Sequence, residues 1–161
     1  MALGVGNIGK VLQQRGELLT TAESCTGGLL AECVTAISGA SKWYAGGWIT
    51  YSNEMKITQL GVPEEMLQEH GAVSEQVATA MCQGAALKSG ATVALSTTGI
   101  AGPSGGTNLK PVGTVFIGCV VDGEVQVKRF LFSGTRNEVR EQAVIAALQL
   151  LCEMLSDKSI S

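Results

Sequence analysis

Histidine is almost missing from this sequence, with His70 as the single one among 161 residues. A metal centre built on histidine ligands is therefore not expected. The five cysteines contain no C-x-x-C pair, so they do not supply the spacing of a metal site either. Their odd number favours reduced thiols over a framework of disulfide bonds. We therefore expect neither a metal ion nor a disulfide-stabilised fold.

Positive charge and long apolar runs are also scarce. The chain has 11 Lys and Arg against 14 Asp and Glu, a net charge of −3, and its basic residues do not cluster. Nucleic-acid binding requires a clustered positive surface, so nucleic acid is not expected as a partner. The sequence has no run of 18 apolar residues and no signal-peptide pattern. We expect a cytoplasmic protein that does not contact a membrane.

Aromatic residues make up only 4% of the chain, whereas glycine occurs 21 times and 45% of the residues are hydrophobic. A core of small aliphatic side chains is typical of α/β proteins. The length predicts one domain over residues 1–161. We expect an α/β fold with three layers (α/β/α) around a mixed, roughly five-stranded sheet.

The order of strands and helices follows from hydrophobic spacing and turn signals. Strands are expected at residues 17–22, 46–51, 92–98, 113–121 and 124–132. The last two should form a hairpin, because Asp122-Gly123 is a two-residue turn signal. Helices are expected before Gly16, from the turn near residue 28 to Ile37, around Lys56, at residues 63–69, after Ser74 and after Thr135.

Residues 4–10, Gly-Val-Gly-Asn-Ile-Gly-Lys, match the dinucleotide-binding pattern G-x-G-x-x-G and nearly match the P-loop. Both motifs require a preceding strand, and only three residues precede this one. Val11 also stands where the P-loop needs a hydroxyl group. We interpret the segment as the start of the first helix.

The stretch from Thr21 to Gly28 predicts a strand, a tight polar turn and the start of a helix. One interpretation is structural, with Ser24 or Thr26 capping the helix. The other is functional, because the N-terminus of a helix attracts anions and glycines allow a ligand close to the backbone. Both remain open at this point.

A serine nucleophile needs a base, and the sequence offers few. His70 lies in Glu69-His70-Gly71, where a helix ends, and we interpret it as a helix cap. Lys56 is the stronger candidate, because a buried lysine can lose its charge near neutral pH. Tyr51 could orient or relay the proton. Cys25 is a rival nucleophile, since a helix start lowers a thiol pKa, although it lacks a histidine partner.

Five motifs occur in a fixed order over nearly the whole chain. They are Ala22-Glu23-Ser24-Cys25-Thr26-Gly27-Gly28, Thr50-Tyr51-Ser52-Asn53-Glu54 with Lys56, Gly71-Ala72-Val73-Ser74, Gly99-Ile100-Ala101-Gly102-Pro103 with Gly105-Gly106, and Lys110-Pro111-Val112-Gly113-Thr114-Val115. In this order they resemble the CinA C-terminal domain family, whose members include nicotinamide mononucleotide deamidases.

The resemblance implies a serine-based amidohydrolase without metal or cofactor. It would convert nicotinamide mononucleotide and water to nicotinic acid mononucleotide and ammonia, which recycles pyridine nucleotides. The family pattern makes Ser24 the nucleophile, assisted by Tyr51 and Lys56, and also implicates Ser41 in the loop before the second strand. A homo-oligomer, a dimer, is expected.

Substrate binding is expected from the polar turns and from the glycine-rich loop at residues 99–113. The candidates are Glu23, Thr26, Gly27, Gly28, Asn53, Gly99, Gly102, Gly105, Gly106, Lys110 and Arg140, with Arg136 as an alternative cation for a phosphate. The competing hypothesis is a non-catalytic nucleotide-binding or regulatory module, in which Ser24 only caps a helix. Such a module needs no base beside Ser24, so Lys56 favours the enzyme.

Overall fold

Five strands form one mixed sheet in the computed structural model, which describes residues 5–160. The strands are β1 (Leu19–Glu23), β2 (Tyr44–Ile49), β3 (Val93–Gly99), β4 (Thr114–Val121) and β5 (Glu124–Leu131). Their order across the sheet is β2-β1-β3-β4-β5. Strands β2, β1 and β3 run parallel, and β4 is antiparallel to β3 and to β5. The predicted mixed sheet and its hairpin are confirmed.

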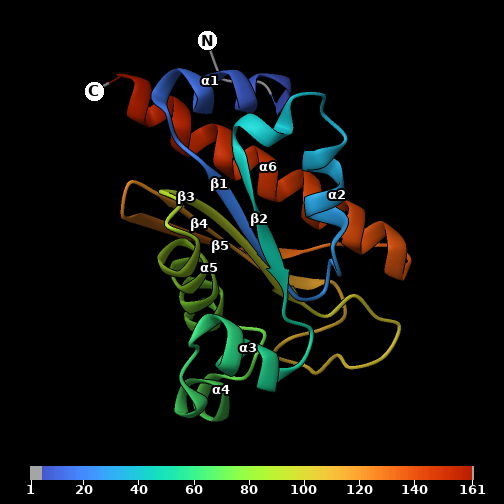
Figure 1. The fold of residues 1–161 in the computed structure, drawn as a ribbon. Coiled ribbons are helices and arrows are strands. Elements are labelled where there is room, and N and C mark those ends of the chain that lie inside the picture. The colour runs from blue at the N-terminus through green and yellow to red at the C-terminus, as the bar shows by residue number, and fades with distance from the viewer. Residues whose placement is uncertain (1–4, 161) are drawn as a thin grey trace.

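Helices cover both faces of the sheet, which gives the predicted three layers (Figure 1). One face carries α1 (Ile8–Arg15), α2 (Leu29–Thr35) and α6 (Arg136–Ile160). The opposite face carries α3 (Asn53–Leu60), α4 (Glu64–His70) and α5 (Glu75–Ser89). Two short 3₁₀ turns, η1 (Val5–Asn7) and η2 (Ala40–Lys42), precede α1 and β2.

The inner strands are buried on both sides because each face of the sheet is covered. Every residue of β1 and β4 is buried, whereas the edge strand β2 alternates between half-buried and exposed positions. The larger core lies beneath α1, α2 and α6 and is mostly aliphatic, with Leu12, Leu19 and Leu150 among its members. This composition explains how a chain with so few aromatic residues fills its interior.

Several local signals act as the sequence predicts. The hydroxyl groups of Ser52 and Ser74 accept hydrogen bonds from N–H groups in the first turns of α3 and α5, at 3.1 and 3.2 Å. Thr135 caps α6 in the same way, at 3.2 Å. Asp122 and Gly123 both have positive φ, 50° and 82°, as the two-residue turn of the β4–β5 hairpin requires.

The glycine pattern near the N-terminus is part of a helix start, as predicted. Residues 5–10 form η1 and the beginning of α1, and Gly4 lies outside the described residues. Gly9 is buried against the indole ring of Trp43, where a Cβ atom would collide. Close packing therefore accounts for this glycine without a phosphate.

Two strand boundaries differ from the prediction. The first strand covers residues 19–23 instead of 17–22, which places Glu23 inside it, and the second covers 44–49 instead of 46–51. The Gly46-Gly47 pair, which begins the predicted strand, lies in the middle of β2. The reason is pairing with β1, since a Cβ on Gly47 would collide with Thr21 of that strand.

The carboxyl ends of β1, β2 and β3 lie side by side along one edge of the sheet, across the strands, because these strands are parallel. The segment between β3 and β4 and the start of α6 after β5 lie at this same edge (Figure 1). Ligands of open α/β sheets bind at such an edge.

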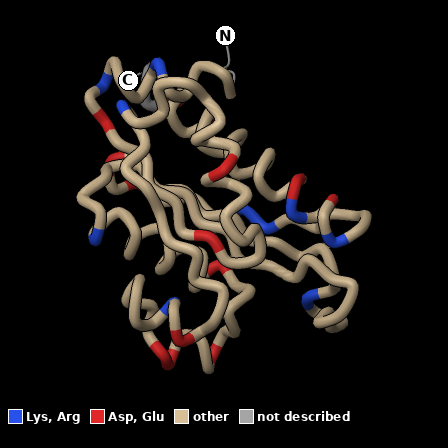
Figure 2. The backbone as a smooth tube through the Cα atoms, turned by 45° about the vertical axis from the view of Figure 1, so that its right-hand side comes forward, with Lys and Arg blue, Asp and Glu red and all other residues tan. Residues whose placement is uncertain are grey.

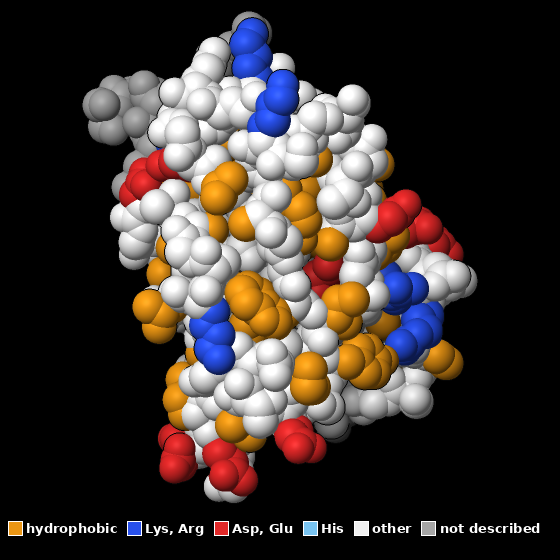
Figure 3. Space-filling model, viewed as in Figure 1, with side chains coloured by type: hydrophobic (Ala, Val, Ile, Leu, Met, Phe, Trp, Pro, Cys, Tyr) orange, Lys and Arg blue, Asp and Glu red, His pale blue; other side chains and the backbone are white. Residues whose placement is uncertain are grey.

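Charged positions are dispersed over the tube in Figure 2, and basic residues form no continuous stripe in the part it describes. On the face in Figure 3, hydrophobic side chains alternate with polar ones. No helix within residues 5–160 is both long and apolar enough to cross a membrane.

Candidate active site

Glu23 at the end of β1 organises the polar turn. Its carboxylate accepts hydrogen bonds from the N–H groups of Gly28, Leu30 and Ala31, at 3.2, 2.9 and 3.1 Å, and from the Thr26 hydroxyl, at 2.6 Å. The side chain is almost fully buried, with 1% of the residue exposed. The N-terminus of α2 is thus capped by Glu23, and the interpretation in which Ser24 or Thr26 caps the helix is wrong.

Because Glu23 caps the helix, the Ser24 hydroxyl is not needed as a helix cap. The turn holds Ser24 through its backbone, whose N–H donates to the Thr97 carbonyl at 3.0 Å and whose carbonyl accepts from the Gly27 N–H at 3.0 Å. Gly27 and Gly28 have φ values of 59° and 107°, which a residue with a Cβ atom adopts only with strain.

Lys56 points from α3 to Ser24. Its Nζ lies 3.0 Å from Ser24 Oγ and donates to the carbonyls of Thr50 and Tyr51 at 2.9 and 3.3 Å. Only 1% of Lys56 is exposed, and none of the described carboxylates forms an ion pair with it. Burial lowers the pKa of its ammonium group, although the nearby Cys25 thiol opposes that shift.

This geometry suits a neutral amine that acts as a base. Two N–H bonds of a neutral Lys56 satisfy the two carbonyls, which leaves the nitrogen lone pair directed at Ser24 Oγ. The hydroxyl of Ser24 can then donate its proton to Lys56. The expected approach of Lys56 to Ser24 is present in the structure, from two turns that follow the neighbouring parallel strands β1 and β2.

Tyr51 does not take the place that a proton relay would need. Its main-chain carbonyl accepts from Lys56, but its side chain is 61% exposed and its hydroxyl accepts a hydrogen bond from Arg136 Nη2 at 3.0 Å. Tyr51 is therefore a wall of the site and contacts Arg136 instead of Ser24. The strand ends two residues before Tyr51, which turns the ring outward.

A cavity of about 290 Å³ opens beside Ser24 and Lys56. Among the predicted binding residues, Asn53, Gly99, Gly102 and Gly105 line it. Its walls come from the turns after β1 and β2, the segment before α5, the loop after β3 and the start of α6. The remaining lining residues are Cys25, Tyr51, Ala72, Val73, Thr98, Ile100, Ala101, Ser104 and Arg136.

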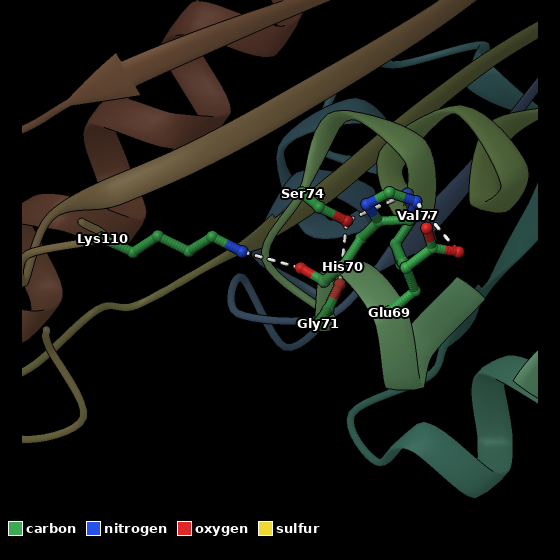
Figure 4. A network of polar contacts seen from close by, with 6 residues as sticks. All are labelled: Glu69, His70, Gly71, Ser74, Val77 and Lys110. Carbon is green, nitrogen blue, oxygen red and sulfur yellow. Dashed lines mark hydrogen bonds and ion pairs between the residues drawn. The ribbon is translucent and has the colours of Figure 1, made fainter. Parts of the chain in front are cut away.

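Lys110 is not among the lining residues. Its Nζ donates to the carbonyl of His70 at 2.8 Å, so it ties the loop after β3 to the end of α4 (Figure 4). The Nε2 atom of His70 lies 3.8 Å from a carboxylate oxygen of Glu69, and His70 does not line the cavity beside Ser24. Lys110 therefore holds the loop after β3 in place and does not bind in the cavity. A long side chain can point in several directions, so its position in the sequence did not reveal this role.

Arg140 also supports the site from outside the cavity. Its guanidinium donates to the carbonyls of Cys25 and Thr26 at 3.2 and 3.0 Å, where it holds the turn that carries Ser24. Arg136, one helical turn earlier, is the arginine that lines the cavity. Gly106 and the residues Glu23, Thr26, Gly27 and Gly28 are likewise outside the lining, because they build the turn and the loop.

Ser41 lies far from this edge in the fold. It belongs to η2, which precedes β2, so it sits at the edge of the sheet opposite to Ser24. There it lines a separate hollow with Tyr44 and Gly46. Within one chain the structure does not bring Ser41 to Ser24.

Cys25 is a poor nucleophile in this structure. It is 6% exposed, and burial raises the pKa of its thiol to about 12. The lowering expected from a helix start is absent, because desolvation outweighs the local hydrogen bond and charges. A thiolate mechanism is therefore disfavoured. The described residues also contain no cluster of three potential metal ligands.

Sequence reasoning missed Thr98, Ser104 and the supporting role of Thr97. Thr97 Oγ1 shares a hydrogen bond with Thr26 Oγ1 at 2.7 Å, and Thr98 lines the cavity. A usable signal was present, since these threonines end the third strand at the same edge as the turn after β1.

Comparison with known proteins gives consistent matches. The family model described as the CinA C-terminal domain matches residues 5–155. A CinA-like protein of Syntrophobacter fumaroxidans is 51% identical over 152 residues, which cover 94% of this chain and 36% of that protein. The nicotinamide-nucleotide amidohydrolase PncC of Escherichia coli is 50% identical over 145 residues, covering 89% of this chain and 88% of that enzyme.

Solved structures agree with the sequence matches. The competence damage-inducible protein A of Klebsiella pneumoniae has a TM-score of 0.91 and 39% identity, with 94% of each chain covered. The chain spans about a third of the length of the first two curated relatives, at 36% of each, but most of the E. coli amidohydrolase. Its sequence, its fold and the order of its motifs show that the chain belongs to the CinA C-terminal domain family.

Proposed function

We propose that this protein hydrolyses the carboxamide of nicotinamide mononucleotide, giving nicotinic acid mononucleotide and ammonia. The observation that carries the proposal is the 3.0 Å contact between Lys56 Nζ and Ser24 Oγ at the wall of the cavity. Bonds to the carbonyls of Thr50 and Tyr51 would hold the turn after β2 in a binding module too, but such a module does not need the contact with Ser24 Oγ. The likeness to an enzyme named nicotinamide-nucleotide amidohydrolase supports the choice of substrate.

The first step adds Ser24 to the carboxamide and forms a tetrahedral adduct. Lys56 takes the proton of the Ser24 hydroxyl while Oγ attacks the carboxamide carbon, and the carbonyl π electrons move to the oxygen. Hydrogen bonding within the turn uses the N–H groups of Ser24, Gly27 and Gly28. The N–H groups of Cys25 and Thr26 take no part in these bonds, and we assign them the role of stabilising the oxyanion.

The second step restores the enzyme. The protonated Lys56 gives its proton to the leaving nitrogen as the C–N bond breaks, so that ammonia departs. Departure of ammonia leaves an acyl-enzyme, and a water molecule attacks its ester carbon while giving a proton to Lys56. Lys56 returns this proton to Oγ as the C–Oγ bond breaks, which releases the carboxylic acid and restores Ser24. No redox or metal step is needed. A nucleotide substrate fits the expected cytoplasmic location.

Ammonia release from a small panel of amides tests this proposal. The panel contains nicotinamide mononucleotide, nicotinamide riboside, nicotinamide and an aliphatic amide, and Ser24→Ala serves as the matched inactive variant. We expect the wild-type chain to release ammonia faster from the nucleotide than from the other three amides, and Ser24→Ala to be inactive on all of them. If the folded wild type binds the nucleotide but releases no ammonia, the chain is a binding module and the proposal is wrong.

A further inference from the structure

The cavity beside Ser24 carries a second cation. None of its lining residues is Asp or Glu, whereas Lys56 and Arg136 both line it. The chain as a whole has a net charge of −3, so this concentration of positive charge is local. An anionic ligand is favoured there over a neutral or cationic one.

Lys56 is not available to bind such an anion. Its Nζ already contacts Ser24 Oγ and two main-chain carbonyls, and only 1% of the residue is exposed. Arg136 is exposed, and no described carboxylate forms an ion pair with it. Its guanidinium is therefore the cation that a ligand in the cavity can reach.

Two hydrogen bonds hold the Arg136 guanidinium in place. Nη1 donates to the carbonyl of Gly102 at 2.7 Å, and Nη2 donates to the Tyr51 hydroxyl at 3.0 Å. A guanidinium has five N–H donors, so three remain for a ligand. Because the side chain is already ordered by the two walls of the cavity, little conformational entropy is lost when it binds.

The loop beside Arg136 adds room and further donors. Gly105 has φ 95°, and a Cβ on it would lie 3.6 Å from Ile100 Cγ2, in ordinary contact; without that Cβ a ligand can come close to the backbone. The Ser104 hydroxyl lies on the same wall. A guanidinium fork with neighbouring hydroxyl and N–H donors matches the oxygens of a phosphate monoester.

Tyr51 lies between Lys56, which contacts Ser24, and Arg136, which can bind an anion. Its main-chain carbonyl accepts from Lys56, and its hydroxyl accepts from Arg136. Lys56 and Arg136 thus contact opposite ends of the same tyrosine. In a nicotinamide nucleotide the carboxamide and the phosphate are likewise separated by the pyridine ring and the ribose.

We infer that Arg136 binds the phosphate monoester of the substrate and thereby selects a nucleotide over the corresponding nucleoside. This inference rests on the proposed function. Arg140 and Lys110, the other cations near the site, satisfy main-chain carbonyls and do not line the cavity. Arg136 is therefore the specificity residue, while the Ser24–Lys56 pair serves any carboxamide that reaches it.

The test compares substrates with and without the phosphate. Ammonia release is measured with nicotinamide mononucleotide and with nicotinamide riboside for the wild type, Arg136→Met, Arg136→Lys and Lys88→Met. Lys88 is exposed near the end of α5, at the opposite edge of the sheet, so its variant is a control for the lost charge. Circular dichroism verifies that each variant is folded.

We expect Arg136→Met to raise KM for the nucleotide by about tenfold to a hundredfold, the effect of losing charged hydrogen bonds, and to leave kcat/KM for the riboside nearly unchanged. For Arg136→Lys, KM for the nucleotide should lie between those of the wild type and Arg136→Met, because lysine keeps the charge but lacks the planar fork of N–H donors. Lys88→Met should match the wild type. An equal loss on both substrates, or no loss on the nucleotide, would overturn the inference.

The inference and the proposed function can fail separately. If the wild type releases ammonia from neither substrate, the proposed function is wrong, and titration calorimetry with the same two compounds then decides the inference. Binding of the nucleotide that weakens in Arg136→Met, with riboside binding unchanged, would support it. Equal affinity of wild type and variant for the nucleotide would reject it.

Discussion

Replacing Lys56 by methionine removes the base while keeping most of the side-chain volume. Lys56 Nζ has its three contacts inside the chain, to Ser24 Oγ and to the carbonyls of Thr50 and Tyr51. The variant leaves two carbonyls without this donor, at a cost of about 1–3 kcal/mol for each buried group. Relief of the buried ammonium acts in the opposite direction. We therefore expect a folded protein, verified by circular dichroism and urea unfolding.

The catalytic loss should be much larger than the structural one. A positioned general base contributes about a hundredfold to ten-thousandfold in rate, so kcat for nicotinamide mononucleotide should fall by that factor. KM should change little, because Lys56 makes its hydrogen bonds within the chain. Arginine at this position should not restore activity, since it does not deprotonate near neutral pH. A Lys56→Met variant that keeps more than about a tenth of the wild-type kcat would refute the lysine base.

The pH profile supplies an independent check on the same residue. Burial lowers the pKa of Lys56, so the neutral amine appears at a lower pH than in an ordinary lysine. Because the base must be neutral, kcat/KM should rise with pH until the lowered pKa is passed. It should then level off, at a pH lower than the ordinary lysine pKa of about 10.4. The rise should be absent from the residual activity of Lys56→Met. A wild-type profile that rises with an apparent pKa at or above the ordinary lysine value of about 10.4 would contradict the assignment.

Two further changes test the architecture of the turn. Glu23→Gln replaces a carboxylate that accepts four hydrogen bonds, so the free energy of unfolding in urea should fall by about 2–4 kcal/mol; a loss below about 0.5 kcal/mol would argue against the cap. Cys25→Ser should keep most of the activity, and alkylation near neutral pH should be slow, because burial raises the pKa of this thiol to about 12. Rapid inactivation that follows alkylation of Cys25 would favour the thiol as nucleophile.

The meeting of Ser24 and Lys56 could be predicted because it follows from topology. Ser24 comes directly after β1, and Lys56 lies in α3, the first helix after β2. The carboxyl ends of neighbouring parallel strands lie side by side. The same rule accounts for Ser41. A loop that precedes a parallel strand lies at the opposite edge from the loop that follows it, so Ser41 before β2 is separated from Lys56 after β2.

Other features depended on geometry that a linear pattern does not contain. Glu23 caps α2 from six residues before Leu29, the first residue of the helix, whereas sequence rules look for the cap directly beside it. Arg136 and Arg140 are one helical turn apart on the same side of α6, so sequence could not tell which of them reaches the cavity. The direction of Lys110 depends on the course of a long loop, which has little periodicity.

The central claim is that Ser24 is the nucleophile of a carboxamide hydrolase, and the rate of ammonia release by Ser24→Ala tests it most directly. The substitution removes Oγ but keeps the turn, because Glu23 caps α2. With nicotinamide mononucleotide as substrate, activity should fall by about a thousandfold or more while the circular dichroism spectrum and nucleotide binding are retained. A folded Ser24→Ala variant that releases ammonia at the wild-type rate would contradict the account.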